Sequence, residues 1–448
     1  MRLLLSFLCI VIISVSSYGQ KVLTLDEAIS IALHRNTTLQ KSSNNIASSE
    51  SNLKAAWGNL LPTINAQGGW QWSYSKQEGT PINLGSFVYT PPSTTSQNRN
   101  YSANVDASWT LFDGLANIAS IAQSQKNLES AKLLLENLKQ NTVFQTISLY
   151  YTVINNQQIV KVKEDNVAWN NRNLETVTER NKLGAVTLAD VYSQQVQAGN
   201  AELDLIQAKN NLENSKSNLL YFLGLDVLQN YTFSDSLTSS EKNILDANLS
   251  NQFSGLNEMV KQALENRADY KSAILDYESS QDAVTIARGG YFPRLSNSLG
   301  YNTYANQLQD LNKSRSFSIG LTLSIPIFSG FSTENNVEMA KVNVMNKKVD
   351  LDDLTRTIKQ NLQQTYLNAD AAKKSLDVNT RNVQAADENL KIAQEKYSLG
   401  SGTLLDVLIA NSNYTNARTN FINSEFQYIV LNEQLKYYLG VLNYKKYE

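Results

Sequence analysis

A ten-residue segment that occurs twice constrains the fold of this chain more than any other feature of the sequence. Residues 182–191 read Lys-Leu-Gly-Ala-Val-Thr-Leu-Ala-Asp-Val, and residues 398–407 read Ser-Leu-Gly-Ser-Gly-Thr-Leu-Leu-Asp-Val. Each segment lies between two long stretches with helical periodicity, so each is predicted to be the tight bend of a helical hairpin. Gly184 and Gly400 supply the permissive backbone that such a bend requires.

The duplication extends far beyond the bends. The two glycines lie 216 positions apart (400 − 184), and the same separation relates three more identical pairs: Phe112 and Phe328, Tyr150 and Tyr366, Gly224 and Gly440. Nearer the N-terminus, Pro62 and Pro293 lie 231 positions apart. The first half therefore holds 15 additional residues (231 − 216) between Pro62 and Phe112, where a longer loop is expected.

Two copies of one unit account for most of the chain. We expect the first repeat at residues 20–225 and the second at 255–441. A linker rich in Ser, Asn and Asp, residues 226–254, joins the two repeats, and we expect it to cross the outside of the molecule about halfway along its length. Residues 442–448 form a short tail.

The first nineteen residues are predicted to be a secretory signal peptide. Arg2 is followed by an apolar run and then by small residues before Gln20, which is the pattern of a cleaved export signal. The single cysteine, Cys9, lies inside this segment. The mature chain therefore has no thiol for disulfides, thiolate metal sites or nucleophilic catalysis.

The remaining composition excludes several classes of function. The formal net charge is −2 and no basic block occurs, which argues against nucleic-acid binding. The sequence has one histidine, His34, and no Ser/His pair, phosphate-binding loop or ligand cluster. We therefore expect neither an enzyme nor a protein with a metal or cofactor.

Two pairs of predicted strands interrupt the helical pattern, at about 63–74 and 101–111 and again at about 294–304 and 315–327. Apolar and polar residues alternate along them with a period of two, which indicates one apolar and one polar face. Each strand is long enough to cross a bilayer when tilted, which takes roughly 9–11 residues. A soluble sandwich with one wet face is the alternative.

The number of strands predicts an oligomer. Four strands cannot close a membrane barrel, which needs about 8, and open sheet edges are not tolerated in lipid. Two chains would supply eight strands, and three would supply twelve and leave room for water. We expect aromatic girdles at the bilayer edges, formed by Trp70, Trp72, Trp109, Tyr74, Tyr101 and Tyr301. The ordinary preference of aromatic residues for β-strands is the alternative explanation of their positions.

The helices give a second prediction of length. The helical hairpins are expected at 114–224 and 330–440, each with a long first helix of about 70 residues, or roughly 100 Å. The returning helix of each hairpin and the shorter helices at 25–59 and 256–290 are each about half as long. Two such helices laid end to end therefore match one long helix in length. The expected result is a tall cylinder with strands at one end and bends at the other.

At this point the sequence resembles the outer membrane efflux (TolC) family. The resemblance rests on the second bend (Tyr397-Ser-Leu-Gly-x-x-Thr-x-x-Asp-Val-Leu), its first-copy version (Asn181-Lys-Leu-Gly), and the corners Leu-Pro62, Phe-Pro293, Leu-Phe-Asp-Gly114 and Ile-Phe-Ser-Gly330. It implies a mainly α fold with a membrane β-barrel. A homotrimer would build a 12-stranded outer-membrane barrel on a long periplasmic helical barrel, in the cell outer membrane of a Gram-negative bacterium.

The resemblance also implies a gate. Tyr397 and Asp190 match a tyrosine–aspartate link between the two hairpins, and Asp406 matches a ring of acidic residues in the closed end. The family's link arginine is Gly402 here, its partner is Ala189, and the second acidic position is Ile409. From the residues alone, Asp190 and Asp406 also fit helix capping by Thr187 and Thr403, and Tyr397 also fits simple packing.

The bends are expected to dock a periplasmic adaptor protein, although turn chemistry alone explains their glycines. The residues are Leu183, Gly184, Ala185, Leu399, Gly400, Ser401 and Gly402.

The resulting hypothesis is a trimeric exit duct of a tripartite efflux system, driven by an inner-membrane transporter of the RND or ABC type through an adaptor. The alternatives are the conduit of a type I protein secretion system and, in a different class, a trimeric coiled-coil surface stalk or adhesin.

Overall fold

A computed structural model describes residues 21–83, 85–234 and 255–447. The predicted signal peptide and most of the predicted linker lie outside the described residues. Contacts divide the chain into two compact units. The sheet unit comprises residues 43–134 and 269–354, and the helical unit comprises the described parts of 1–42, 135–268 and 355–448. Each unit takes segments from both halves of the duplication.

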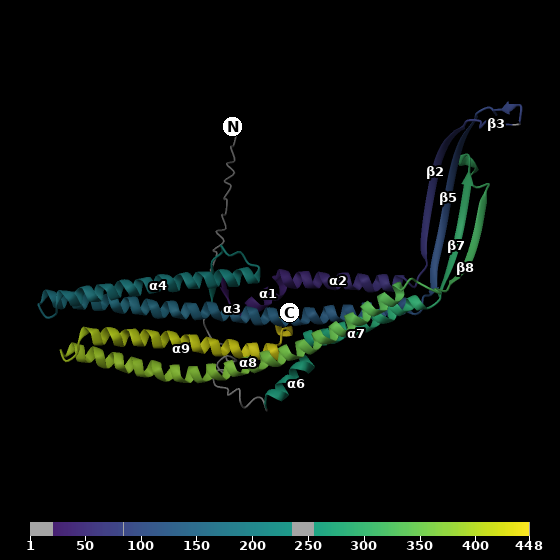
Figure 1. Cartoon of the computed structure of the whole chain (residues 1–448). Helices are drawn as coiled ribbons and strands as arrows, with labels where there is room; N and C mark the ends of the chain where they lie inside the picture. Colours follow the sequence, from purple (N-terminus) through teal and green to yellow (C-terminus); the bar gives the residue numbers. More distant parts are fainter. Residues whose placement is uncertain (1–20, 84, 235–254, 448) are drawn as a thin grey trace, which may run out of the picture. The chain divides into compact units, whose positions relative to one another are not determined.

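The sheet unit contains a four-stranded antiparallel sheet (Figure 1). Its strands, in spatial order, are β2 (Thr63–Gln77), β5 (Thr94–Phe112), β7 (Arg294–Ala305) and β8 (Arg315–Ser324). The two strand pairs of the duplication therefore form one continuous sheet, in which β5 and β7 are neighbours. β2 and β8 are its edges.

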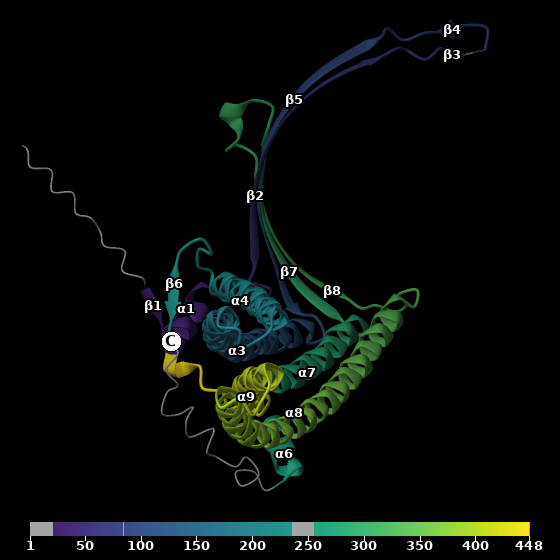
Figure 2. The same cartoon turned by 90° about the vertical axis from the view of Figure 1, so that its left-hand side faces the viewer.

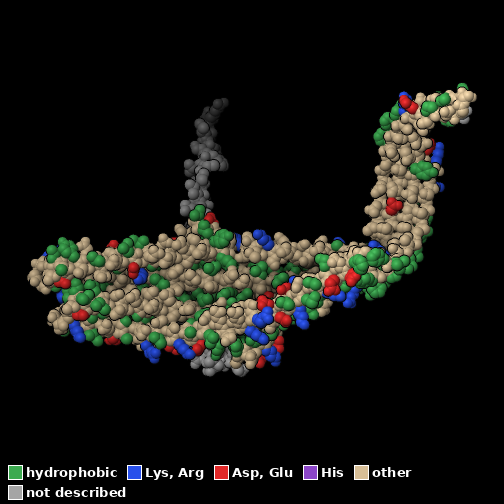
Figure 3. Space-filling model, in the orientation of Figure 1, with side chains coloured by type: hydrophobic (Ala, Val, Ile, Leu, Met, Phe, Trp, Pro, Cys, Tyr) green, Lys and Arg blue, Asp and Glu red, His purple; other side chains and the backbone are tan. Residues whose placement is uncertain are grey.

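The register of the sheet separates two chemically different faces. Ala66 pairs with Val105, Val105 with Tyr301, and Tyr301 with Phe317, and directly paired residues project to the same side. Between the Trp70–Tyr101 pair and the base, this face is mostly apolar in every strand, with Asn297, Thr303 and Arg315 as exceptions. Much of it is exposed in the single chain; Ile319, for example, is 71% exposed. The opposite face consists of Ser, Thr, Asn, Gln and Gly with few exceptions, and Figure 3 shows it as nearly free of hydrophobic side chains.

The structure has longer strands than the sequence predicted in the first copy. β2 continues to Gln77 and β5 begins at Thr94, so the expected loop is largely a paired hairpin. Two short strands, β3 (Ile82–Asn83) and β4 (Val88–Tyr89), pair near its end (Figure 2). Pairing with β7 stops at Tyr101 and Ala305, so this hairpin extends past its neighbour. In the second copy the last strand is shorter than the predicted range of 315–327. β8 ends at Ser324, two residues before Pro326, which has no N–H to donate to a neighbouring strand.

The helices follow the predicted order, with two differences. The described helices are α1 (Leu25–Arg35), α2 (Thr37–Gly58), α3 (Ala116–Lys182), α4 (Leu188–Leu223), α6 (Leu256–Asn266), α7 (Ala268–Arg288), α8 (Ser332–Ser398) and α9 (Leu404–Tyr438). The predictions of single helices at 25–59 and 256–290 were wrong.

Asn36 and Arg267 cause the two breaks. Asn36 leaves the helical conformation, and its Oδ1 accepts hydrogen bonds from the backbone N–H groups of Thr38 and Leu39, so it caps α2. Arg267 is also extended, and its guanidinium donates to the carbonyl of Tyr438 at 3.2 Å. The Asn36 side-chain amide also donates to the carbonyl of Phe222 at 3.4 Å, and Phe222 is equivalent to Tyr438 in the duplication. Both copies therefore break at equivalent positions with a hydrogen bond to the same carbonyl of the returning helix, and the first copy adds a local cap.

The main core lies in the helical unit around Tyr150, Leu219 and Ile429. A small parallel sheet joins β1 (Lys21–Leu23) to β6 (Tyr231–Phe233), so the start of the predicted linker is part of this core. The predicted tail also contributes, through Leu442 and Tyr444 and a short 3-10 helix, η4 (Lys445–Tyr447).

In the described parts of the chain, no helix combines the length and apolar character that crossing a membrane requires.

Tyr150→Phe tests how the N-terminal strand is held. The Tyr150 hydroxyl lies 3.1 Å from the Leu23 carbonyl and 2.9 Å from the Ser234 carbonyl. Losing this buried donor should lower the free energy of unfolding by about 1–2 kcal/mol, measured by thermal unfolding of the purified protein. Tyr221→Phe is the control, because Tyr221 is 81% exposed. Equal stability of both variants would contradict the assignment.

Candidate functional site

The two bends have nearly the same backbone geometry. Gly184 has φ 72° and Gly400 has φ 77°, in the left-handed region that favours glycine. One residue later, the N–H of Ala185 donates to the carbonyl of Arg180, and the N–H of Ser401 donates to that of Lys396, both at 2.9 Å. Each helix is therefore closed at its end by the same kind of terminal hydrogen bond.

Reciprocal capping boxes start both returning helices, as the sequence predicted. The Asp190 N–H donates to Thr187 Oγ1, and the Thr187 N–H donates to Asp190 Oδ2. Thr403 and Asp406 repeat this arrangement at 3.0 and 3.2 Å. Hydrogen bonds from the Thr403 side chain and backbone, helped by Lys396, hold the pKa of Asp406 below its usual value. Its charge therefore persists to lower pH than that of a free aspartate.

The structure does not form the hydrogen bond between Tyr397 and Asp190 that the family resemblance implies. The Tyr397 hydroxyl is buried and has no hydrogen-bond partner among the described residues. Asp190 is engaged with Thr187, because its Oδ2 accepts hydrogen bonds from both the backbone N–H and the side-chain hydroxyl of Thr187.

Arg180 connects the two hairpins at this level instead. Its guanidinium lies over the ring of Tyr397, 4.8 Å from the ring centre. Tyr397 also packs against a small hydrophobic cluster that includes Val407 and Trp169. A cation over an aromatic face is attracted to it, so α3 and α8 are held together next to the bends. Sequence reasoning missed Arg180, although a basic residue one turn before a predicted bend was a usable signal.

Further from the bends, a polar layer joins the hairpins. Asn411 on α9 donates to Asn166 on α3 at 2.8 Å, which links the second hairpin to the first. Within the first hairpin, Gln194 on α4 donates to the backbone carbonyl of Asn170 on α3 at 3.0 Å. The side chains of Gln194 and Asn170 are buried, so their hydrogen bonds fix the register of these helices.

The predicted docking residues form exposed tips. Leu183 is 84% exposed and Leu399 is 82% exposed, and Gly184, Ala185, Gly400 and Ser401 are exposed with them. Gly402 is half-buried, and a Cβ there would lie 3.1 Å from the Cβ of Lys396 and 3.2 Å from the Tyr397 nitrogen. The close approach of the chain explains why glycine, rather than the family's arginine, suits this bend.

A groove beside the second bend contains Asp406. It has a volume of about 370 Å³ and is lined by α8 and α9, including Lys396, Gly402 and Ile409. The described residues contain no group of three or more acidic or metal-ligating side chains that could hold a metal ion.

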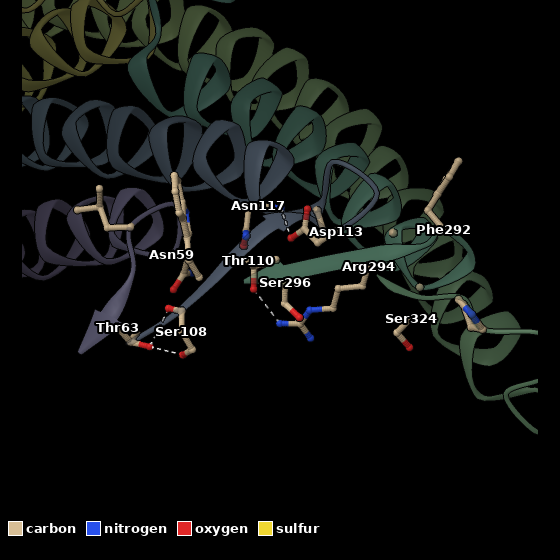
Figure 4. A pocket seen from close by; sticks show the side chains of 16 residues that line it. Asn59, Thr63, Ser108, Thr110, Asp113, Asn117, Phe292, Arg294, Ser296 and Ser324 are labelled. Atoms are coloured by element: carbon tan, nitrogen blue, oxygen red, sulfur yellow. Dashed lines mark hydrogen bonds between the residues drawn. The ribbon is translucent and has the colours of Figure 1, made fainter. Parts of the chain in front are cut away.

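A larger pocket of about 830 Å³ lies at the base of the sheet, on its polar face (Figure 4). Ends of all four strands and the start of α3 contribute to it. The Arg294 guanidinium donates to Thr110 Oγ1 at 3.1 Å, and the Thr63 and Ser108 hydroxyls lie 2.7 Å apart. This pocket could not be predicted from the sequence, because its residues come from four separate segments of the chain.

The predicted girdle residues all lie on the apolar face of the sheet. Tyr101 and Trp109 are eight positions apart on β5, or about 27 Å along the strand. Trp70, Trp72 and Tyr74 lie at the Tyr101 end, and Tyr301 pairs with Val105, midway between Tyr101 and Trp109. Trp109 lies near the base, where its indole donates to the Leu60 carbonyl. Their role at bilayer edges stays a prediction.

Comparisons with known proteins agree with this architecture. A family model described as outer membrane efflux protein matches residues 28–225 and 259–441. Outer membrane protein TolC of Salmonella enteritidis is 22% identical over 420 residues, which are 91% of this chain and 80% of that protein. Proteases secretion protein PrtF of Dickeya chrysanthemi is 27% identical over 177 residues, 38% of this chain and 37% of that one.

Solved structures share the fold. The CmeC outer membrane channel of Campylobacter jejuni has a TM-score of 0.79 to this chain at 19% identity, and the match covers 94% of this chain and 88% of CmeC.

Two substitutions of Tyr397 separate its ring from its hydroxyl. Tyr397→Phe keeps the aromatic face under Arg180 and removes a buried hydroxyl without a partner, so trypsin cleavage near the bends should not increase. Tyr397→Leu keeps an apolar side chain but loses the aromatic face, so cleavage at Lys182 and Lys396 should be faster. Faster cleavage of Tyr397→Phe would restore a role for the hydroxyl.

Proposed function

The chain belongs to the outer membrane efflux protein family, and from this we infer that it is the outer-membrane exit duct of a tripartite efflux system. We propose that three copies of the chain form the duct, with a 12-stranded barrel in the membrane and the helical hairpins in the periplasm. Substrates would enter from an inner-membrane transporter and a periplasmic adaptor and leave to the exterior.

The observation that carries the proposal is the four-stranded sheet. It has one apolar face that the described chain leaves exposed, one polar face, and two edge strands. An apolar face outside and a polar face inside are what lipid and a water-filled channel require. Edges are removed when β8 of one copy pairs with β2 of the next, and twelve strands leave room for solutes.

The bends support a regulated entrance. The exposed Leu183 and Leu399 offer small apolar tips for a partner helix, and the contact between Arg180 and Tyr397 is worth only about 1 kcal/mol at a partly exposed site. Three such contacts make a closure that a partner's binding energy can overcome. We propose that an adaptor engages these tips and separates the hairpins.

Type I protein secretion is the second candidate. The similarity to Proteases secretion protein PrtF favours it, although the match covers 38% of this chain. Capture of the inner-membrane partner by cross-linking at Gly184→Cys or Gly400→Cys in cells would distinguish an efflux pump from a secretion transporter. A surface stalk would show no single-channel conductance.

Cross-linking of the sheet edges tests the trimer. The mature chain has no cysteine, so Gln67→Cys on β2 with Ser318→Cys on β8 creates one pair of thiols on the polar face at opposite edges. A short thiol cross-linker should give covalent dimers and trimers on a denaturing gel. Gln67→Cys with Ser298→Cys on the inner strand β7 is the control and should stay monomeric. Monomers from both pairs would contradict the barrel.

Cation block tests the proposed acidic ring. Three Asp406 carboxylates at one level of a narrow lumen would bind divalent or trivalent cations added from the periplasmic side. Asp406→Asn should weaken this block of conductance in planar bilayers at least tenfold. Asp190→Asn removes the matching cap in the other hairpin and should leave the block unchanged. Equal block of all three proteins would exclude Asp406 from the constriction.

A further inference from the structure

The polar face of the sheet carries very little charge. The strand register assigns β2 no charged residue on this face, β8 none, β5 only Asp106 and β7 only Arg294. The other charged residues of these strands, such as Arg99 and Arg315, fall on the opposite face, paired with Trp72 and Thr303. A wall of hydroxyl and amide groups thus contains one carboxylate and one guanidinium.

Asp106 is held by neutral groups. Its Oδ2 accepts a hydrogen bond from Asn104 at 2.6 Å, and it forms no ion pair with any described residue. The residue opposite on β7 is Gly300, where a Cβ would lie 3.4 Å from Asp106 Oδ1 and 2.8 Å from Ser318 Oγ. Because Gly300 has no side chain, the Asp106 carboxylate has room on this face of the sheet, where Asp106 is half-buried.

Arg294 is too distant to neutralise this charge. The Arg294 guanidinium lies beside Thr110, which is four positions along β5 from Asp106, or about 13 Å. The screening length at physiological ionic strength is about 8 Å, so each charge acts on its own section of the wall. The Arg294 guanidinium donates to Thr110, another neutral group.

We propose that Asp106 is a specificity-determining residue of the membrane section, where it favours cationic over anionic solutes, and that Arg294 acts in the opposite sense at the base. This inference rests on the proposed trimer, which places three copies of each residue around one lumen. Because no protein cation balances Asp106, mobile cations in the lumen must do so.

The expected size of the effect depends on salt. At 10 mM salt, where the screening length is about 30 Å, three carboxylates about 10 Å from the axis of a twelve-stranded barrel enrich cations about fourfold and deplete anions to a similar extent, and the three Arg294 charges oppose part of this effect. At 1 M salt that length is about 3 Å, and the enrichment vanishes.

Reversal potentials in planar bilayers measure this preference directly. With a KCl gradient near 10 mM, Asp106→Asn should lower the permeability ratio of K⁺ to Cl⁻ by about tenfold, because the same charge enriches cations and depletes anions, and Arg294→Gln should raise it. Ser298→Lys adds a positive charge to the same face without altering Asp106, and it should also lower the ratio. Asn104→Ser removes the hydrogen bond but keeps the charge, so it is the matched control and should leave the ratio unchanged.

The outcomes separate this inference from the proposed function. Asp106→Asn and Ser298→Lys trimers that conduct normally, with the wild-type ratio at 10 mM salt, would overturn the role of Asp106 and leave the channel intact. A wild-type protein that forms no conducting trimer would overturn both. A difference in the permeability ratio between Asp106→Asn and the wild type that is as large at 1 M salt as at 10 mM would also overturn the role of Asp106, because high salt must screen an electrostatic effect.

Discussion

The backbone groups along the outer edges of β2 and β8 impose the strongest physical demand in this molecule. A sheet edge presents a row of N–H and C=O groups, and in lipid no water is available to satisfy them. The apolar face beside them equally requires lipid or protein, because the described chain leaves Ile319 and its neighbours exposed. Association of chains satisfies both demands in one step. In the proposed trimer, the lumen, the symmetry at the bends and the rings of identical side chains would all be consequences of that closure.

The bends illustrate how duplication keeps a backbone and changes the chemistry on it. The glycine turn and the capping box are the same in both copies. The residue three positions before the turn glycine differs between the copies: it is Asn181 in the first and Tyr397 in the second. Asn181 donates to the Val186 carbonyl within its own bend, whereas Tyr397 contacts Arg180 of the other hairpin. One bend is thus closed on itself, and the other supplies the aromatic ring that links the pair.

Features with a local cause could be predicted from the sequence, and those with a distant cause could not. The bends at Gly184 and Gly400 and their caps follow from short patterns that appear twice. The alternation in the strands placed every aromatic girdle residue on one face. By contrast, the break at Arg267 depends on a carbonyl 171 positions away, and the partner of Tyr397 comes from the other half of the chain. The break at Asn36 combines a local cap with a hydrogen bond to a carbonyl 186 positions away, and asparagine inside a helical pattern is too common to reveal either. The pocket at the base of the sheet needed the tertiary arrangement of four strands.

The division of the chain has a consequence for biogenesis. Each compact unit takes segments from both repeats, and β5 must pair with β7, which follows it by nearly two hundred residues. Neither half can therefore finish folding while the other is still being exported, and pairing between such distant segments is slow. During that delay the apolar face of β2 and β5 is open to aggregation. The order of export thus decides when the sheet can be completed, because β5 has no neighbour on its β7 side until the second half has arrived.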